Sequence, residues 1–379
     1  MGFFEKCVFL LSFFLERTIK HMINNETSKA LQEWYDKNKR DLPWRQTKDP
    51  YLIWVSEIIL QQTQVAQGLD YYCSFVRRFP DIQRLAEAEE VEVLKYWQGL
   101  GYYSRARHMH ESAKTINERF KGIFPNQYKD VLTLKGVGEY TAAAIVSLAH
   151  NQPYPVVDGN VYRVLARLFA IDTPIDTEKG KKEFHALAAA LMPPDQAHIH
   201  NQAIMEFGAL QCVPKNPDCT SCPLSCKCLG YATGRQLQYP IKQNKTKTRD
   251  RYLHYFFILN GSDTYIRRRS GKDIWKGLYE LPLIETETKM DFAELKEETT
   301  FRQLFDRTGQ TDFFNADVNI KHVLSHQILH TTFYEANIQI ENPTLLTYVK
   351  IPLSSLDEYP FPTLLRAYLD RKINAIINR

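Results

Sequence analysis

Five of the seven cysteines in this 379-residue chain lie within seventeen positions, from 212 to 228. Four of them follow the spacing Cys212-x6-Cys219-x2-Cys222-x5-Cys228. In a chain without a disulfide-rich composition, thiolates gathered this closely indicate metal or cluster ligands rather than disulfide partners. The fold must therefore place the sulfur atoms of these cysteines around one metal or cluster site.

The cysteine spacing favours an iron–sulfur cluster over zinc. Zinc usually takes two short Cys-x2-4-Cys pairs, whereas here one tight pair is flanked by wider arms. Four cysteines at uneven spacing suit a cubane cluster better. Zinc and plain buried thiols remain alternatives. Cys226 also competes with Cys228 as the fourth ligand, since this exchange changes the last spacing only from x5 to x3.

Length and composition predict a globular protein of two domains. A chain of 379 residues exceeds what one core normally organises. A net charge of +4 permits a nucleic-acid partner without requiring one. The apolar run within residues 1–21 is too short to span a membrane, which takes about 20 residues, and lacks the features of a secretory signal. We expect a cytoplasmic protein in which residues 1–21 are an extra segment or precede a true start at Met22.

The pattern along the chain changes once. Residues 28–232 carry apolar residues at helical spacing. A polar, basic connector runs from Tyr231 to Arg251 and is either a solvated linker or a strap that contacts phosphates. Beyond it the residues alternate as in strands. We therefore predict a helical domain at 22–232, a linker at 233–250 and an α+β domain at 251–379. The clearest expected elements are helices at 85–96, 105–119, 161–170, 292–306 and 362–377, and strands at 252–259, 263–268, 322–329 and 331–340.

Two motifs in the helical half precede predicted helices. Gly136 and Gly138 form a hairpin whose free backbone N–H groups are suited to binding a phosphate at a helix N-terminus. Asp158 precedes the helix predicted at 161–170. Because Asn160 fits the N-cap of that helix, we expect Asp158 to be free and held ionised by the positive helix end.

A carboxylate also lies on an apolar helical stripe. Glu57 shares a face with Ile53, Trp54 and Leu60, and burial there raises a carboxyl pKa. Such a residue is either a structural hydrogen-bond acceptor or a general acid that stays protonated near neutral pH. The segment 99–107 combines a glycine turn with aromatic and cationic residues, a combination that proteins use to unstack a duplex.

Taken together, these motifs resemble the helix-hairpin-helix DNA glycosylases that carry an iron–sulfur loop. The glycine hairpin, the Val-Asp-Gly-Asn aspartate and the cysteine loop occur in the order of that superfamily. The segments Leu42–Arg45, Ser56–Gln64 and Gly99–Arg107 narrow the resemblance to adenine DNA glycosylases of the MutY type. The resemblance implies a [4Fe-4S] cluster on Cys212, Cys219, Cys222 and Cys228, with Cys226 as a spectator.

The same resemblance implies roles for the other residues. Glu57 would protonate N7 of a flipped adenine, and Asp158 would stabilise the oxocarbenium-like sugar electrostatically or by transient covalent capture. Tyr140 stands where bifunctional relatives with lyase activity have a lysine, so water should finish the reaction. Adenine-pocket positions would be Leu42, Trp44, Arg45 and Gln202. Gln62 and Tyr102 would enter the duplex beside the oxidised guanine.

The C-terminal domain resembles the Nudix-related module that such glycosylases use to read 8-oxoguanine. Residues 275–282 match the start of a Nudix core, but residues 284–298 lack the acidic pattern of an active hydrolase. Ser325 and His326 match the reading loop of the family, in which Leu324 replaces the usual phenylalanine. Lys135 likewise replaces the usual proline of the hairpin.

The sequence is therefore interpreted as a monomeric, two-domain base-excision repair enzyme. It would remove adenine mispaired with 8-oxoguanine or guanine in double-stranded DNA, at the nucleoid. A glycosylase-lyase of the endonuclease III type is one alternative, disfavoured by Tyr140 and the C-terminal module. A non-catalytic DNA-binding protein is another, disfavoured by the presence of both Glu57 and Asp158.

Overall fold

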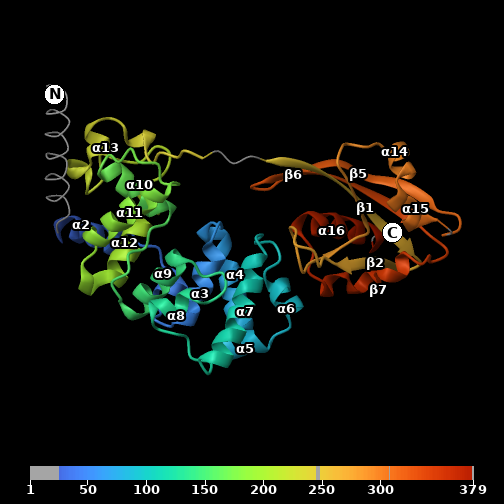
Figure 1. Ribbon diagram of the computed structural model, residues 1–379, viewed down its shortest axis with the longest axis horizontal. Coiled ribbons are helices and arrows are strands. Elements are labelled where there is room, and N and C mark those ends of the chain that lie inside the picture. Colours follow the sequence, from blue (N-terminus) through green and yellow to red (C-terminus); the bar gives the residue numbers. More distant parts are fainter. Residues whose placement is uncertain (1–24, 245–247, 307, 378–379) are drawn as a thin grey trace. The chain divides into compact units, whose positions relative to one another are not determined.

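The computed structural model describes residues 25–244, 248–306 and 308–377 (Figure 1). Residues 1–21 and Met22 lie outside the described residues. The chain divides into two compact units, one formed by residues up to 86 with 111–244, the other by 87–110 with 245–379. Within the described ranges, no helix is both long and apolar enough to cross a membrane.

The first unit is built from helices (Figure 1). In chain order they are α2 (Asn25–Asn38), η1 (Pro43–Arg45), α3 (Pro50–Leu60), α4 (Val65–Arg78), α5 (Ile82–Glu87), α8 (Tyr128–Leu132), α9 (Glu139–His150), α10 (Gly159–Leu168), α11 (Glu178–Leu191), η2 (Pro194–Gln196), α12 (Ala197–Leu210), η3 (Ser225–Lys227), α13 (Leu229–Ala232) and η4 (Gln236–Gln238). Helices α6 (Glu90–Tyr96) and the first part of α7 (Ser104–Arg119) fall in the second unit.

Local sequence signals set several of these helix ends. Asp49 caps α3 by accepting a hydrogen bond from the Tyr51 N–H at 2.8 Å, and Pro50 occupies the first turn. The predicted single helix at 85–96 is wrong, because the chain is extended at Glu89 and separates α5 from α6. The acidic residues Glu90 and Glu92 favour a new helix start there, since they lie in its first turn.

The core of the first unit lies among α2, α10, α11 and α12. Leu31, Val164, Phe184 and Phe207 are buried in it, each from a different one of these helices. The cysteine segment that follows α12 packs against the same core. The apolar stripes of these helices therefore fix the place of the cysteine segment.

The second unit contains a seven-stranded sheet with the order β3-β2-β1-β6-β5, in which β4 pairs with β1 and β7 with β2. β1 and β6 are parallel, and the other pairs are antiparallel. The strands are β1 (Arg249–Asn260), β2 (Asp263–Arg268), β3 (Tyr279–Glu280), β4 (Leu283–Thr286), β5 (Asp312–Val323), β6 (Gln327–Asn337) and β7 (Val349–Pro352). The helices are α14 (Phe292–Glu297), α15 (Thr299–Phe305), η5 (Leu345–Thr347), η6 (Leu353–Glu358) and α16 (Thr363–Ile377).

Helices cover both faces of this sheet (Figure 1). Successive side chains of a strand point to opposite faces. Tyr255 and Phe257 of β1 accordingly pack with residues of α16, whereas Phe256 and Ile258 pack with residues of α14 and α15. The predicted α+β architecture is confirmed, and β1 lies buried between two apolar layers.

Two predicted elements of this unit are wrong. The helix expected at 292–306 is interrupted at Glu298, which is extended, and the β-branched Thr299 and Thr300 that follow disfavour an unbroken helix. The strand expected at 322–329 is interrupted at 324–326 by a tight turn between the end of β5 and the start of β6, closed by a 2.8 Å bond from the Leu324 N–H to the Gln327 carbonyl oxygen.

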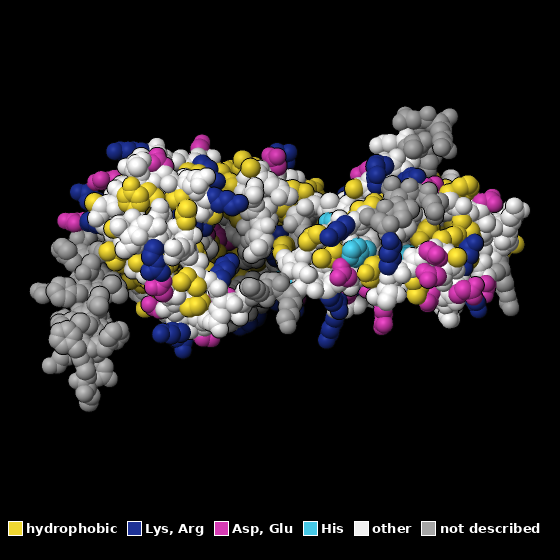
Figure 2. All heavy atoms as spheres, turned by 90° about the horizontal axis from the view of Figure 1, so that it is seen from above, with side chains coloured by type: hydrophobic (Ala, Val, Ile, Leu, Met, Phe, Trp, Pro, Cys, Tyr) yellow, Lys and Arg dark blue, Asp and Glu magenta, His cyan; other side chains and the backbone are white. Residues whose placement is uncertain are grey.

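Surface charge is mixed in sign. On the face shown in Figure 2, Lys and Arg side chains are interspersed with Asp and Glu rather than gathered in one patch. This distribution agrees with the modest net charge of +4. Nucleic-acid contacts on this face would rest on individual groups rather than on a broad basic surface.

Candidate active site

Three side chains from three helices meet in the first unit. Glu57 lies in the last turn of α3, Tyr140 is the second residue of α9, and Asp158 directly precedes α10. The Tyr140 hydroxyl donates a hydrogen bond to the Glu57 carboxyl, and Asp158 is near enough to repel it electrostatically. Each of the three residues keeps some exposed surface.

The environment of Glu57 sets its protonation. Burial of the carboxyl is the main cause that raises its pKa to about 7, and the charge of Asp158 adds to it. The hydrogen bond from Tyr140 opposes the shift. A carboxyl group with a pKa near neutrality can both hold and release a proton at pH 7, which is what general acid catalysis requires.

Asp158 is itself the N-cap of α10, so the expectation that Asn160 would cap this helix is wrong. The helix begins at Gly159, two residues earlier than predicted, and the Val161 N–H donates to Asp158 Oδ1 at 2.8 Å. The Asn160 side-chain amide donates to Asp158 Oδ2 at 2.8 Å. Burial raises the pKa of Asp158, while these two donors and Arg163 lower it by favouring the charged form.

A network of polar side chains joins the residues predicted to line a base pocket. Arg45 in η1 pairs with the buried Glu206 at 2.6 Å and lies over the Tyr35 ring. The Tyr35 hydroxyl donates to Gln202 Oε1 at 2.5 Å, and the Gln202 amide contacts the His198 ring at 3.1 Å. The orientation of the Gln202 amide is therefore fixed from both ends.

Helix α12 connects this network to the acids. It carries Gln202 and, one turn later, Met205, whose sulfur lies 3.7 Å from the Tyr140 hydroxyl oxygen. Leu42 and Trp44 are buried on either side of Pro43, and the Trp44 ring packs edge-on against the Tyr72 ring. Sequence reasoning missed Tyr35, His198 and Glu206, because they lie in ordinary amphipathic helices without a motif.

The two residues expected to enter a duplex have strained backbones. Gln62 has φ 60° and Tyr102 has φ 45°, both in the left-handed region that non-glycine residues rarely adopt. Gln62 is exposed, and Tyr102 is 49% exposed. Backbone strain of this kind is concentrated at functional sites.

The glycine hairpin lies directly before α9. Gly136 has φ 77°, which favours glycine, and Gly138 is the N-cap of α9 without a side-chain hydrogen bond to the helix. Lys135 pairs with Glu111 at 2.6 Å, and its carbonyl oxygen accepts a hydrogen bond from Ser112 at 3.0 Å. These bonds to α7 hold the hairpin in place at Lys135.

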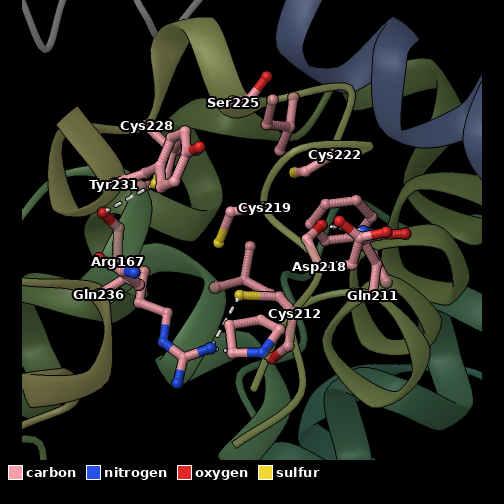
Figure 3. Close-up of a pocket in the computed structure, with 15 residues that line it drawn as sticks. Arg167, Gln211, Cys212, Asp218, Cys219, Cys222, Ser225, Cys228, Tyr231 and Gln236 are labelled. Carbon is pink, nitrogen blue, oxygen red and sulfur yellow. Dashed lines mark hydrogen bonds between the residues drawn. The ribbon is translucent and has the colours of Figure 1, made fainter. Parts of the chain in front are cut away.

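Four cysteines line one cavity in the first unit, as Figure 3 shows. They are Cys212, Cys219, Cys222 and Cys228. Cys226 is exposed and does not line the cavity. An Arg167 N–H lies 3.4 Å from Cys212 Sγ, where its positive charge can offset thiolate charge.

The four cysteine side chains that line this cavity could serve as metal or cluster ligands. A zinc site needs its sulfur ligands at about 2.3 Å from one point. Within the described residues, no group of three or more His, Cys, Asp or Glu side chains is placed to hold one metal ion. Burial raises the pKa of the Cys222 thiol to about 12, so ligand binding must displace protons.

The turn between β5 and β6 carries Ser325 and His326. Both line a cavity of the second unit together with Tyr102 and Trp275. The Tyr102 hydroxyl and Ser325 Oγ are 2.5 Å apart. Leu324 is partly buried and packs against the core beneath α16. The structure thus brings Tyr102 beside the turn that carries Ser325, although the two residues are 223 positions apart in the chain.

The basic connector does not behave as one segment. Arg235 pairs with Asp172 at 2.7 Å, and Asp176 accepts hydrogen bonds from the backbone N–H groups of Gln243 and Asn244. Arg251 is buried within β1 and paired with carboxylates. For Arg251, both the solvated linker and the phosphate-contacting strap are therefore wrong.

Comparisons with known proteins agree with both halves of the chain. Residues 55–194 match the HhH-GPD superfamily of base excision DNA repair proteins, and residues 254–371 match the NUDIX domain. A thermostable thymine-DNA glycosylase structure aligns with a TM-score of 0.52 and 28% identity, covering 57% of this chain and 98% of that one. The predicted combination of a helix-hairpin-helix domain with a Nudix-like domain is confirmed.

Comparison with curated sequences identifies the family more narrowly. The human adenine DNA glycosylase is 42% identical over 52% of this chain and 38% of its own length. The adenine DNA glycosylase of Buchnera aphidicola subsp. Baizongia pistaciae (strain Bp) is 33% identical over 80% of this chain and 83% of its own length. With most of its length aligned to such a relative, this chain belongs to the adenine DNA glycosylase family of base excision repair enzymes.

Proposed function

We propose that this protein removes adenine paired with 8-oxoguanine or guanine in double-stranded DNA. The observation that carries the proposal is the Glu57 carboxyl, with a pKa of about 7, next to Asp158. Membership of the adenine DNA glycosylase family supports the choice of base. We further propose that it acts as a monomer, in the cytoplasm at the nucleoid.

In the proposed reaction, Glu57 donates a proton to N7 of a flipped adenine. The protonated base leaves with the electrons of its bond to the sugar, and an oxocarbenium-like cation remains. The charge of Asp158 stabilises that cation in a partly dry pocket, electrostatically or by transient capture. Tyr140 offers no amine for a Schiff base, so water completes hydrolysis.

Four residues are proposed to hold the base. They are Leu42, Trp44, Arg45 and Gln202. Leu42 and Trp44 supply apolar surface. Burial raises the pKa of Glu206, but the hydrogen bonds that it accepts from Arg45 and Arg40 lower it to about 2. Glu206 therefore stays ionised at neutral pH and holds the Arg45 side chain in place. The fixed amide of Gln202 can then present a defined hydrogen-bonding edge to the base.

Contacts to DNA are proposed at three further places. The hairpin N–H groups at Gly136 and Gly138 would bind a phosphate at the N-terminus of α9. Gln62 and Tyr102, exposed on strained turns, would enter the duplex and assist flipping. Ser325 and His326 would read the 8-oxoguanine that remains.

The proposed cofactor is a [4Fe-4S] cluster held by Cys212, Cys219, Cys222 and Cys228. When bound, it would cross-link the segment between α12 and α13, because Cys212 lies just after α12 and Cys228 just before α13. Arg167 would offset part of its negative charge through the contact to Cys212. Cys226 would remain outside the ligand set.

Serine substitutions test this ligand set. Protein purified anaerobically should be brown and contain about four irons per chain. Protein with Cys219→Ser or Cys222→Ser should be colourless and should have a lower thermal unfolding midpoint, because the cluster that joins the cysteine segment is lost. The matched control Cys226→Ser should change neither. Colourless, zinc-loaded protein that still binds the duplex would contradict the assignment.

The protonation of Glu57 predicts a pH dependence. Because its pKa is raised to about 7, the acid is available below this value and is lost as pH rises through it. Above about pH 7, kcat/KM for adenine release should fall roughly tenfold per pH unit. A flat profile up to pH 9 in single-turnover assays would show that another group supplies the proton.

The reading turn can be tested by removing its polar side chains. Ser325→Ala with His326→Ala should reduce the preference for adenine opposite 8-oxoguanine over adenine opposite guanine. Base contacts of this type contribute roughly 1–3 kcal/mol each, so the loss should reach at least about fivefold. An unchanged ratio of the two rates would mean that other residues recognise 8-oxoguanine.

One assay separates the proposed function from its alternative. A glycosylase-lyase forms a Schiff base that borohydride traps as a covalent protein–DNA adduct. We expect adenine release without a trapped adduct. A strong adduct would favour the endonuclease III type, and the absence of any released base would favour a DNA-binding protein without activity.

A further inference from the structure

Arg251 is a buried arginine whose five N–H donors are all used. Its side chain is 8% exposed. Nε and Nη2 donate to the two Glu285 oxygens at 2.6 Å each, and Nη1 and Nη2 donate to the Asp273 oxygens at 2.9 and 2.8 Å. The remaining bond runs from Nη1 to Gln327 Oε1 at 3.0 Å. Such a fully bonded guanidinium is held in one position.

The bond to Gln327 reaches the end of the turn that carries Ser325 and His326. Gln327 is the first residue of β6, and its carbonyl oxygen closes the turn by accepting from the Leu324 N–H at 2.8 Å. The Arg249 N–H donates to the His326 carbonyl oxygen at 3.1 Å. Strand β1 thus fixes the turn through one backbone bond and one charged side-chain bond.

The far side of Arg251 is equally well anchored. Asp273 also pairs with Arg269 at 2.8 Å, and Arg269 pairs with Glu280, which is 2% exposed. Asp273 lines the same cavity as Ser325 and His326. A chain of alternating charges therefore runs from the buried part of the sheet to the wall of that cavity.

We infer that Arg251 is a positioning residue that fixes the Ser325–His326 turn through Gln327 and so sets the preference for 8-oxoguanine. The inference rests on the proposed role of that turn as the reader. Specific hydrogen bonds depend on placement within a few tenths of an ångström, so a turn held by β1 discriminates better than a loose one.

The test leaves the ion pairs intact, because removing Arg251 would take a guanidinium from both Asp273 and Glu285 at once and so change more than the turn. Gln327→Met keeps the length of the side chain but removes the acceptor. It should lower the ratio of excision rates, adenine opposite 8-oxoguanine to adenine opposite guanine, by about three- to tenfold. The thermal unfolding midpoint should fall by only a few degrees, because one Arg251 N–H loses its acceptor while its four bonds to carboxylates remain. Gln327→Glu keeps an acceptor for Arg251 and should restore most of the ratio.

Comparison with three other variants makes the outcome decisive. Lys296→Gln, on the exposed surface of α14, is the matched control and should leave the ratio unchanged. If Ser325→Ala with His326→Ala lowers the ratio but Gln327→Met does not, the positioning inference is wrong, whereas the proposed recognition of 8-oxoguanine by the Ser325–His326 turn is supported. If Gln327→Glu is as impaired as Gln327→Met, Gln327 acts through its own amide and not through Arg251, which also overturns the inference. If neither set of variants changes the ratio, both the reader and its positioning are wrong.

Discussion

Replacing Glu57 by glutamine should reduce adenine excision by about 10²–10⁴-fold, the range typical of lost general acid catalysis. Glutamine keeps the size of the side chain and still accepts the hydrogen bond from Tyr140, but it has no acidic proton to give. Binding to the mismatched duplex should be nearly unchanged. Single-turnover release of adenine, measured beside equilibrium binding to the same duplex, separates the two effects.

The exposed Glu118 provides a matched control for this substitution. Glu118→Gln removes one carboxylate from the same unit and should leave excision within twofold. If Glu57→Gln excised adenine within a few-fold of the unsubstituted protein, Glu57 would be a structural residue and the acid would lie elsewhere.

Replacing Asp158 by asparagine should reduce excision by about 10²–10³-fold, the loss expected when one preorganised electrostatic group is removed. Asparagine and aspartate are similar N-caps, and the amide oxygen can still accept the bond from the Val161 N–H. The helix should therefore keep its stability while the pocket loses its negative charge. A normal unfolding midpoint with severely reduced excision is the expected combination.

The double substitution tests whether both residues serve one transition state. In that case Glu57→Gln with Asp158→Asn should be little worse than the more impaired single variant. Losses that multiply in full would mean that the two carboxyl groups act in separate steps. Asp158→Asn with lost stability and unaffected excision would reduce Asp158 to a helix cap.

The local spacing of motifs predicted much of the site. Cys212, Cys219, Cys222 and Cys228 line one cavity as their clustering indicated, and Cys226 does not. The spacing of such cysteines is informative because one metal or cluster site needs several ligands from a short segment. The two-domain architecture followed likewise from the change between helical and alternating periodicity.

The errors arose where an exact boundary decides a role. Asp158 is an N-cap because α10 begins at Gly159, and periodicity cannot locate a helix start to one residue. Ser325 is in a turn because the strands stop on either side of it. In both cases the residue was singled out from the sequence, but its local backbone geometry was not predicted.

Other groups were beyond sequence reasoning because their partners are far apart in the chain. Glu206 holds Arg45 and Arg40 across more than 160 positions. Arg251 reads as part of a basic connector until β1 places it against Asp273 and Glu285. Nothing local in the sequence marks these long-range pairs, and only the packed fold shows them.

The most direct test of the account is the identity of the base that the protein releases. A duplex with one adenine opposite 8-oxoguanine should yield free adenine in a single turnover, faster than a duplex with adenine opposite guanine. The same duplex with adenine opposite thymine should yield little. Release of a different base, or equal release from all three duplexes, would contradict the proposed function.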